Sequence, residues 1–258
     1  MLAEQINAYM AERGCTFEVR FYESVGSTNT VLAELARSGA PEFTAVIAGT
    51  QTAGRGRGEH RFFSPAGCGI YFSLLLRPKF PAETAAKLIT PAAAVAAAQA
   101  IECVSGETAG IKWVNDIFVR GRKVCGILTE ASPDGSGGLA WVIPGIGINV
   151  CPPEGGYPAE ISATAGAVFP GKAPEDAAAR LAVETIERLI GLYRVMPECG
   201  FRVEYDRRLT LKGRRVSYGI GRRGTVLGVD SDFCLLIRTE QGSIEALDSG
   251  EVRCSDTI

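Results

Sequence analysis

The segment most able to do chemistry is the glycine- and arginine-rich stretch Gly54-Arg55-Gly56-Arg57-Gly58, which is followed by Arg61. Glycine at every second position frees the backbone to fold tightly around a ligand. The arginines between them carry fixed forks of donors that suit phosphate or carboxylate groups. The apolar residues 44–51 and 69–76 on either side are typical of strands. A cationic loop between two strands predicts an anion-binding site, although the loop alone is also compatible with an RNA-binding segment.

Other segments of the chain could complete such a site. Lys112-Trp113-Val114-Asn115-Asp116 ends a predicted strand with an amide and a carboxylate, and Lys123 follows in the next hairpin. Gly145 and Gly147 share one face of a strand, where a flat ligand could approach the backbone. Ser27-Thr28-Asn29 offers hydroxyls and an amide at a predicted helix start. Alone these segments are most simply a turn, a hairpin lysine, a packing site and a helix cap, so only their combination is informative.

Helices and strands must position these side chains. Hydrophobic periodicity and cap signals predict helices over residues 2–13, 28–38, 82–104, 174–195 and 199–209. Apolar runs predict strands over 16–22, 44–51, 69–76, 111–113, 117–119, 124–130 and 139–150. After residue 212, short apolar runs separated by turn signals predict a small β-barrel or sandwich. We therefore expect two domains, residues 1–212 and 213–258.

Composition and charge narrow the class of protein. The 258 residues are 46% hydrophobic and 22% charged, as in an ordinary soluble globular protein. The net charge of −2 argues against a bulk nucleic-acid binder. Eight cysteines without a Cys-x-x-Cys pair, and a single histidine, argue against a zinc site and for free thiols in a reducing cytoplasm. No signal-peptide pattern begins the chain, and the alanine-rich residues 92–100 are too few to span a membrane.

Taken together and in this order, the segments resemble the biotin protein ligases, over residues 27–253. The motifs that carry the resemblance are Ser27-Thr28-Asn29, Gln51-x-x-Gly54-Arg55-Gly56-Arg57, Ser64-Pro65-x-Gly67, Lys112-Trp113-x-Asn115-Asp116, Lys123-x-x-Gly126-Ile127-Leu128-x-Glu130 and Gly145-x-Gly147-Ile148-Asn149. The resemblance implies an α+β fold: a mixed β-sheet with helices packed on it, followed by a small SH3-like β-barrel. This agrees with the boundary expected near residue 212.

The resemblance also implies a reaction in two steps. Biotin and ATP, with Mg²⁺, give biotinyl-5′-AMP and pyrophosphate, and biotin then passes to one lysine of a biotin carboxyl carrier domain. The carboxylate of biotin must meet the α-phosphate, so cations have to lie between two anions; Arg55, Arg57 and Lys123 are the candidates. In the second step the acceptor lysine must lose its proton, because at a pKa of about 10.4 under about 0.1% is neutral at pH 7.

The resemblance assigns roles residue by residue. The residues expected to bind biotin are Ser27, Thr28, Asn29, Gln51, Gly54, Arg55, Gly56, Arg57, Lys123, Gly126 and Gly145. The residues expected at the nucleotide are Arg57, Phe62, Lys112, Trp113, Asn115, Lys123 and Asn149. Arg57, Lys123 and Asp116 are expected to be catalytic, with Asp116 orienting Lys123. No metal ligand is assigned.

The chain departs from the family pattern in and near the loop. Glu59 stands where many members have glycine, His60 where they have arginine, Phe62 where they have tryptophan, and Val114 where they usually have proline. Phe62 still provides an apolar wall. Glu59 and His60 remove one cation and add an anion, so we expect the loop to retain biotinyl-AMP less firmly and to leak it onto bystander lysines.

Other functions have weaker support. A DNA-binding regulator is disfavoured because only residues 1–15 precede the first predicted strand. A lipoate- or octanoate-type ligase of the same fold is an alternative, with Cys68 and Cys125 as available thiols, and so is a non-catalytic biotin-binding module. The expected protein partner is a carrier domain of a biotin-dependent carboxylase. A homodimer through the edge of the catalytic sheet and a monomer both remain open.

Overall fold

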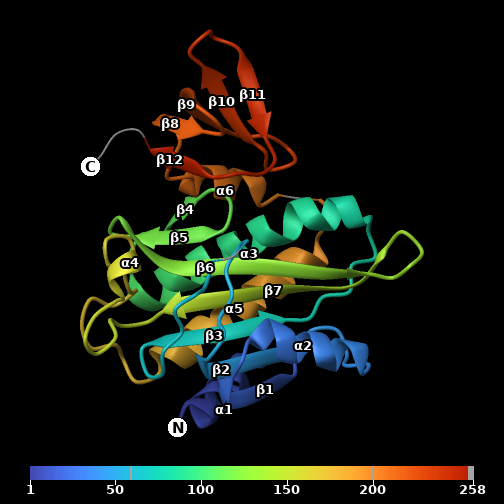
Figure 1. Cartoon of the computed structure of the whole chain (residues 1–258). Coiled ribbons are helices and arrows are strands. Elements are labelled where there is room, and N and C mark those ends of the chain that lie inside the picture. The colour runs from blue at the N-terminus through green and yellow to red at the C-terminus, as the bar shows by residue number, and fades with distance from the viewer. Residues whose placement is uncertain (59, 199, 255–258) are drawn as a thin grey trace.

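A seven-stranded mixed sheet forms the larger part of the computed structural model, which describes residues 1–58, 60–198 and 200–254. Its strand order is β1-β2-β3-β7-β6-β5-β4 (Figure 1). β1 and β2 are parallel, and every other neighbouring pair is antiparallel, so the predicted mixed sheet is confirmed. The strands are β1 (Val19–Val25), β2 (Ala45–Gln51), β3 (Gly69–Leu74), β4 (Gly110–Lys112), β5 (Asp116–Val119), β6 (Arg122–Pro133) and β7 (Leu139–Asn149).

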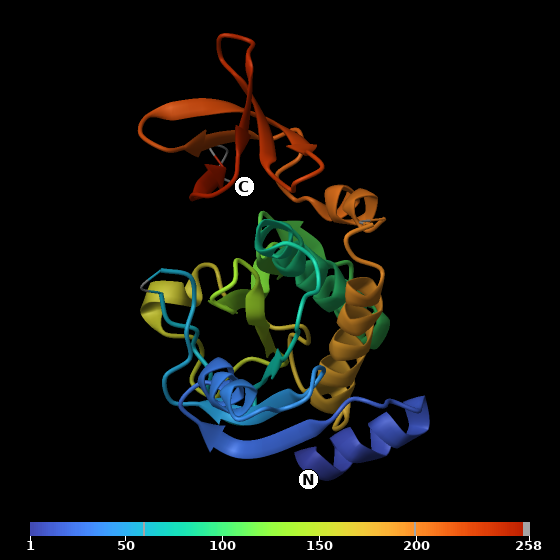
Figure 2. The ribbon, with the colours of Figure 1, turned by 90° about the vertical axis from the view of Figure 1, so that its right-hand side faces the viewer.

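Helices cover both faces of this sheet, as side-chain alternation along β2 shows. Ala45 and Ile47 belong to the main apolar core, which α3 (Ala82–Ser105) and α5 (Ala177–Arg194) share. Val46 between them belongs to a smaller core on the other face, under α2 (Thr28–Arg37). α1 (Leu2–Arg13) packs on α5, and α4 (Ala159–Ser162) lies in the long connection after β7 (Figure 2). The predicted arrangement of helices on a sheet is therefore confirmed.

α3 is long and apolar enough, by length and composition alone, to cross a membrane. However, 67% of its most apolar window is buried inside the protein. Its alanines have small side chains, so the helix lies close to β6, β7 and α5. Burial in the core accounts for the apolar composition of this helix.

A second sheet follows α6 (Arg202–Arg208) and is antiparallel throughout. Its order is β11-β10-β9-β8-β12, built from β8 (Arg215–Tyr218), β9 (Arg222–Val229), β10 (Leu235–Thr239), β11 (Ile244–Leu247) and β12 (Val252–Cys254). This small sheet is consistent with the predicted SH3-like barrel, and we call it the barrel below. It begins close to residue 212, while the division into two domains stays a prediction.

The barrel is attached to the larger part of the chain through Phe233. Its ring stacks on Phe201 and meets the Tyr205 ring edge-on, and only 3% of the residue is exposed. The indole Nε1–H of Trp113 donates to the Phe233 carbonyl at 2.8 Å. Lys87 of α3 also pairs with Asp232, at 2.9 Å. These contacts fix the barrel next to the β4–β5 hairpin (Figure 1).

Some predicted elements differ from the observed ones. β1 begins at Val19 instead of residue 16, because its pairing with β2 runs from Val19 opposite Ala45 to Val25 opposite Gln51. α4 has only four residues and was not predicted. The predicted free thiols are confirmed for the seven cysteines that the structure describes; Cys199 lies outside the described residues.

Candidate functional site

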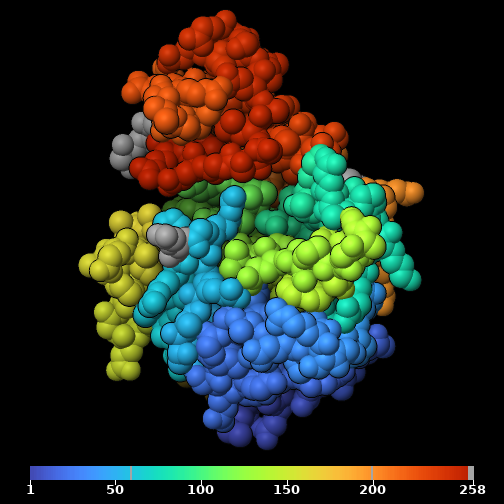
Figure 3. Space-filling model, turned by 45° about the vertical axis from the view of Figure 1, so that its right-hand side comes forward, coloured from blue at the N-terminus to red at the C-terminus, as the bar shows by residue number. Residues whose placement is uncertain are grey.

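A cavity of 640 Å³ opens over β6 and β7, between the start of α2, the β4–β5 hairpin and the barrel. In Figure 3 the cyan chain of the loop after β2 lies at the surface just below the red barrel. Most of the predicted site residues line this cavity: Ser27, Thr28, Asn29, Gln51, Arg55, Gly56, Arg57, Phe62, Lys112, Trp113, Asn115, Asp116, Lys123, Gly126 and Gly145. Segments far apart in the sequence are thus brought to one place.

The glycine–arginine loop, residues 52–63, folds back on itself as a small hairpin. The Phe62 N–H donates to the Gly54 carbonyl at 3.1 Å, and the Gly56 N–H donates to the His60 carbonyl at 2.8 Å. A Cβ on Gly54 would lie 2.5 Å from the Phe62 carbonyl oxygen, so no side chain fits there. Gly54 therefore serves the close approach of the two arms and does not line the cavity. The predicted site residue Arg57 lies near the tip of the hairpin.

The arginines of the loop differ in their partners. Arg55 Nη2 lies 2.7 Å from Glu130 Oε2 and 3.2 Å from Thr30 Oγ1, so a carboxylate already balances its charge. The side chain of Arg57 makes no hydrogen bond or ion pair with any described residue, and it is exposed. Among the candidate cations of the loop, Arg57 is therefore the better placed to meet an added anion.

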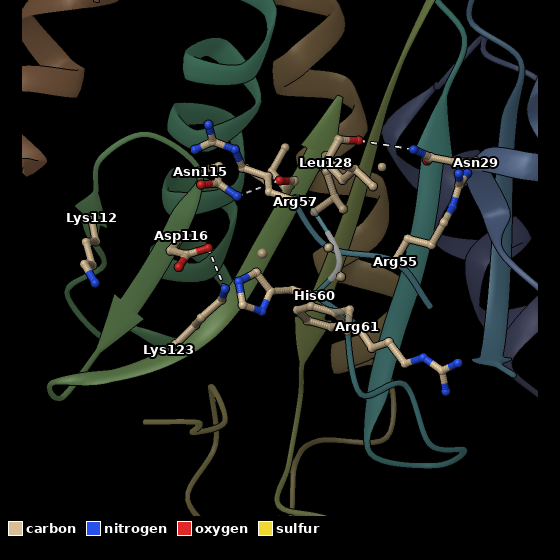
Figure 4. Close-up of a pocket in the computed structure, with 18 of the residues that line it drawn as sticks. Asn29, Arg55, Arg57, His60, Arg61, Lys112, Asn115, Asp116, Lys123 and Leu128 are labelled. Carbon is tan, nitrogen blue, oxygen red and sulfur yellow. Dashed lines mark hydrogen bonds and ion pairs between the residues drawn. The ribbon is translucent and has the colours of Figure 1, made fainter. Parts of the chain in front are cut away.

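Lys123 and Asp116 face each other across the β5–β6 hairpin. Lys123 Nζ lies 2.6 Å from Asp116 Oδ1, and Figure 4 shows the two groups pointing toward one another. The expected contact between them is observed, while its catalytic role stays a prediction. Asn115 is held beside them, because its Nδ2 donates to the Ile127 carbonyl at 2.8 Å. These three side chains occupy the end of the cavity nearest the barrel.

The side chains at the polar end of the cavity hydrogen-bond to one another. Gln51 Oε1 accepts from the Thr28 backbone N–H at 2.9 Å and from its hydroxyl at 3.2 Å, and Gln51 Nε2 donates to Ser64 Oγ at 3.1 Å. Ser73 Oγ donates to Thr28 Oγ1 at 2.7 Å and to Asn29 Oδ1 at 2.5 Å. Ser73 was not predicted, although a serine within the apolar run of β3 was a signal. The amides and hydroxyls are thereby preoriented.

Three glycines of β6 and β7 form the floor of the cavity. Gly126 pairs with Gly147, and Gly145 pairs with Leu128. The sequence predicted that a flat ligand approaches this bare backbone, but in the structure the chain covers the floor itself. A Cβ would come within 2.5 Å of the Phe62 ring at Gly147 and within 2.8 Å at Gly126. At Gly145 it would overlap the Asn29 amide. Glycine is needed here to seat these two side chains.

Asn149 and the residues that depart from the family pattern do not all line the cavity. Asn149 does not line the cavity; its Nδ2 donates to the Gly166 carbonyl at 2.9 Å and so holds the connection after β7. His60 and Phe62 both line the cavity, and His60 is exposed. Val114 does not line the cavity; its carbonyl accepts a hydrogen bond from the Tyr205 hydroxyl of α6. Glu59 lies outside the described residues.

Sequence reasoning missed part of the lining. The missed residues are Gly58, Arg61, Phe118, Ile127, Leu128, Ile146, Gly147, Thr164, Gly250, Glu251 and Val252. The apolar ones read as ordinary strand residues. Thr164 and the barrel turn at 250–252 carry no local signal, because only the folded chain brings them to the cavity. Several of them stood within or beside segments already singled out, although no role was assigned to them: Gly58, Arg61, Ile127, Leu128 and Gly147.

Thiol chemistry and a resident metal have little support in this site. Cys68 and Cys125 are buried, neither lines the cavity, and burial raises the pKa of both thiols. A thiol in that state is a poor nucleophile. Within residues 1–58, 60–198 and 200–254, no group of three or more His, Cys, Asp or Glu side chains could hold a metal ion.

Comparison with known proteins agrees with the resemblance seen in the sequence motifs. Residues 21–149 match the model of the biotin/lipoate A/B protein ligase family. The bifunctional ligase/repressor BirA of Bacillus spizizenii is 34% identical over 233 residues, which is 86% of this chain and 70% of that protein. The biotin–[acetyl-CoA-carboxylase] ligase of Paracoccus denitrificans is 41% identical over 130 residues, half of each protein (50%).

A solved structure extends the likeness to the whole fold. The biotin protein ligase from Aquifex aeolicus in complex with biotin and ATP superposes with a TM-score of 0.77 at 27% identity. The superposition covers 92% of this chain and 99% of that one. The chain therefore belongs to the biotin/lipoate A/B protein ligase family, and within it to the biotin protein ligases.

Proposed function

We propose that this protein is an ATP-dependent ligase that activates biotin as biotinyl-5′-AMP and transfers it to a lysine of a biotin carboxyl carrier domain. The observation that carries the proposal is the division of one cavity into an end of preoriented amides and hydroxyls and an end with Arg57 and Lys123. The named activity of the Paracoccus relative and the ligands of the Aquifex structure support it.

The polar end suits the ureido ring of biotin. That ring is neutral and presents both N–H donors and a carbonyl acceptor. Ser27, Thr28 and Gln51 offer hydroxyl and amide groups of both kinds. The hydrogen bonds between Thr28 and Gln51 lower the cost of ordering these two residues around a ligand. Biotin bound there would direct its carboxylate toward the cationic end.

The cationic end suits the bond-forming step. The carboxylate of biotin attacks the α-phosphate of ATP, pyrophosphate leaves, and the negative charge at phosphorus is stabilised by Arg57 and Lys123. Asp116 holds the Lys123 ammonium in place at 2.6 Å. Asn115, Lys112 and Trp113 line the cavity where the nucleotide would lie. Mg²⁺ suits phosphate oxygens and few protein ligands, so it would arrive with the triphosphate and neutralise it.

The second step requires access for a protein lysine and exclusion of water. The neutral amine attacks the mixed anhydride, its proton passes to solvent or a nearby base, and AMP leaves. The glycine–arginine loop, lying over the cavity, would shield the anhydride until the carrier docks. A cytoplasmic location fits seven described free thiols. β1 pairs only with β2 in the described sheet, so its free edge is where a homodimer would form.

Pyrophosphate release on mixing the protein with biotin and ATP tests the proposal. Lys123→Ala should abolish biotin-dependent release, whereas Lys172→Ala, at an exposed lysine outside the cavity lining, should leave it unchanged. Arg57→Gly should slow biotin-dependent release, because it removes one of the two cations at phosphorus, and should also let the adenylate escape. Release with lipoate or octanoate in place of biotin would favour the alternative ligase. No release with any of these acids would refute a ligase.

A further inference from the structure

Glu130 connects the loop to the polar end of the cavity, although it does not line the cavity itself. Its Oε2 atom accepts from Arg55 Nη2 at 2.7 Å and from Asn29 Nδ2 at 2.7 Å. Arg55 additionally donates to Thr30 Oγ1 at 3.2 Å. One carboxylate on β6 is thus shared by the loop and by the start of α2.

The Arg55 side chain is the tether of the loop. Of the described loop residues 55–58 and 60–61, it alone donates side-chain hydrogen bonds to the rest of the chain. Because the two arms are joined between Gly54 and Phe62 and between Gly56 and His60, holding Arg55 holds the hairpin as a unit. The Phe62 end of the hairpin is held separately, because the Ser64 hydroxyl donates to the Phe62 carbonyl at 3.0 Å and accepts from Gln51 Nε2 at 3.1 Å.

Asn29 links this tether to the site of biotin. Its Oδ1 accepts from Ser73 Oγ and its Nδ2 also donates to the Leu128 carbonyl at 3.2 Å, so the side chain is fixed on three sides. Figure 4 shows the Asn29 amide directed at Leu128, with the Arg55 side chain extending toward it. A change at the carboxylate would therefore affect both the loop and the polar end.

We propose that Glu130 is a positioning residue that latches the glycine–arginine loop over the cavity through Arg55, and so retains the activated acid until the carrier arrives. This rests on the proposed function for the nature of the retained species. The latch itself is a statement about the loop and holds without any ligand. Loss of the carboxylate should leave Lys123 and Asp116 in place and should open the loop, which carries Arg57, more often.

Trypsin offers a direct probe of the latch because it cuts after arginine, and the loop carries Arg57 at its exposed tip. In limited digestion without ligand, Glu130→Gln should raise the rate of cleavage after Arg57 about five-fold, the change in open population that a partly exposed ion pair supports. Glu187→Gln is the matched control: its pair with Arg13 at 3.0 Å has 43% and 26% side-chain exposure, against 44% and 33% for Arg55 and Glu130.

A charge exchange separates the latch from a general loss of structure. Glu130→Arg places a like charge beside Arg55 and should raise cleavage further. Combining it with Arg55→Glu restores an ion pair and should return cleavage after Arg57 toward the wild-type rate. Equal cleavage in the wild type, Glu130→Gln and Glu130→Arg would overturn the latch, and so would failure of the exchange to protect the loop.

Activity gives the second readout. With biotin and ATP, Glu130→Gln should still release pyrophosphate and should label serum albumin, a protein that is not a carrier, about five-fold more than the wild type for each pyrophosphate released. An unchanged ratio would contradict retention by the latch. If the wild type releases no biotin-dependent pyrophosphate, the proposed function fails while the digestion result still decides the latch.

Discussion

Replacing Gly147 with alanine tests whether the Phe62 ring belongs on the glycine floor. An added Cβ would lie 2.5 Å from Phe62 Cε1 and 2.9 Å from both Cδ1 and Cζ. Ordinary carbon contacts are about 3.5–4.0 Å, so the two groups must separate by about 1 Å. Gly147 is paired with Tyr71 on β3 and with Gly126 on β6, so the sheet cannot yield and the ring must move.

The cost follows from what the ring loses. Phe62 leaves the floor and its edge-to-face contact with Tyr71, where the centroids are 6.3 Å apart. Overpacking of this kind lowers the free energy of unfolding by about 1–3 kcal/mol. The backbone itself accepts alanine, because Gly147 has no positive φ. Gly126→Ala, with its nearest ring carbon at 2.8 Å, should cost less than Gly147→Ala.

Urea unfolding without ligand measures these differences. Gly171→Ala is the control, since its Cβ would meet nothing within 4 Å, and it should change the free energy of unfolding by less than about 0.5 kcal/mol. In a Phe62→Ala background, Gly147→Ala should lose most of its penalty. A penalty of the same size in both backgrounds would show that the ring is not the cause and would refute the reasoning.

Three further outcomes are expected. Hydrogen bonding from Arg207 lowers the pKa of Glu204 from 4.5 to about 2, so the stabilising contribution of Glu204 is present above pH 4.5 and is lost as the pH falls toward 2. The free energy of unfolding in urea should therefore fall between about pH 7 and pH 3, and this fall should be about 1 kcal/mol smaller in Glu204→Gln than in the wild type. Trp113→Phe removes the donor to the barrel carbonyl and should lower the free energy of unfolding by about 1–2 kcal/mol in the same assay. Glu59→Gly combined with His60→Arg should reduce labelling of a non-carrier protein below the wild-type level, and equal, low labelling in both would contradict the leak.

The elements best predicted from sequence are those whose ends are set locally. α1 spans residues 2–13 as expected, because Gly14 takes the left-handed conformation, with φ 69°, that ends a helix. The start of α3 was predicted correctly, and its end within one residue, since Gly106 acts in the same way with φ 74°. β1 was displaced because it is an edge strand whose burial does not alternate, and its register depends on β2. Long-range pairing carries that information, and the local sequence does not.

The site shows the same limit at the level of single side chains. The motifs predicted which segments meet, and they do line one cavity. They did not predict that Asn149 turns to the Gly166 carbonyl, or that a barrel turn ending at Val252 completes the wall. Each depends on a contact between residues far apart in the chain, which residue type and spacing do not encode.

Arg55 and Arg57 show what such contacts add to a functional argument. Two residues apart in one motif, they carry the same charge and the same donors, so the sequence treats both as cations for the reacting anions. In the structure Arg55 is bound by a carboxylate at 2.7 Å, and Arg57 has no partner among the described residues. Removing Arg55 should therefore act on loop position, and removing Arg57 on the charge that faces the adenylate. The roles of the individual residues in a motif can be assigned only when the partner of each side chain is known.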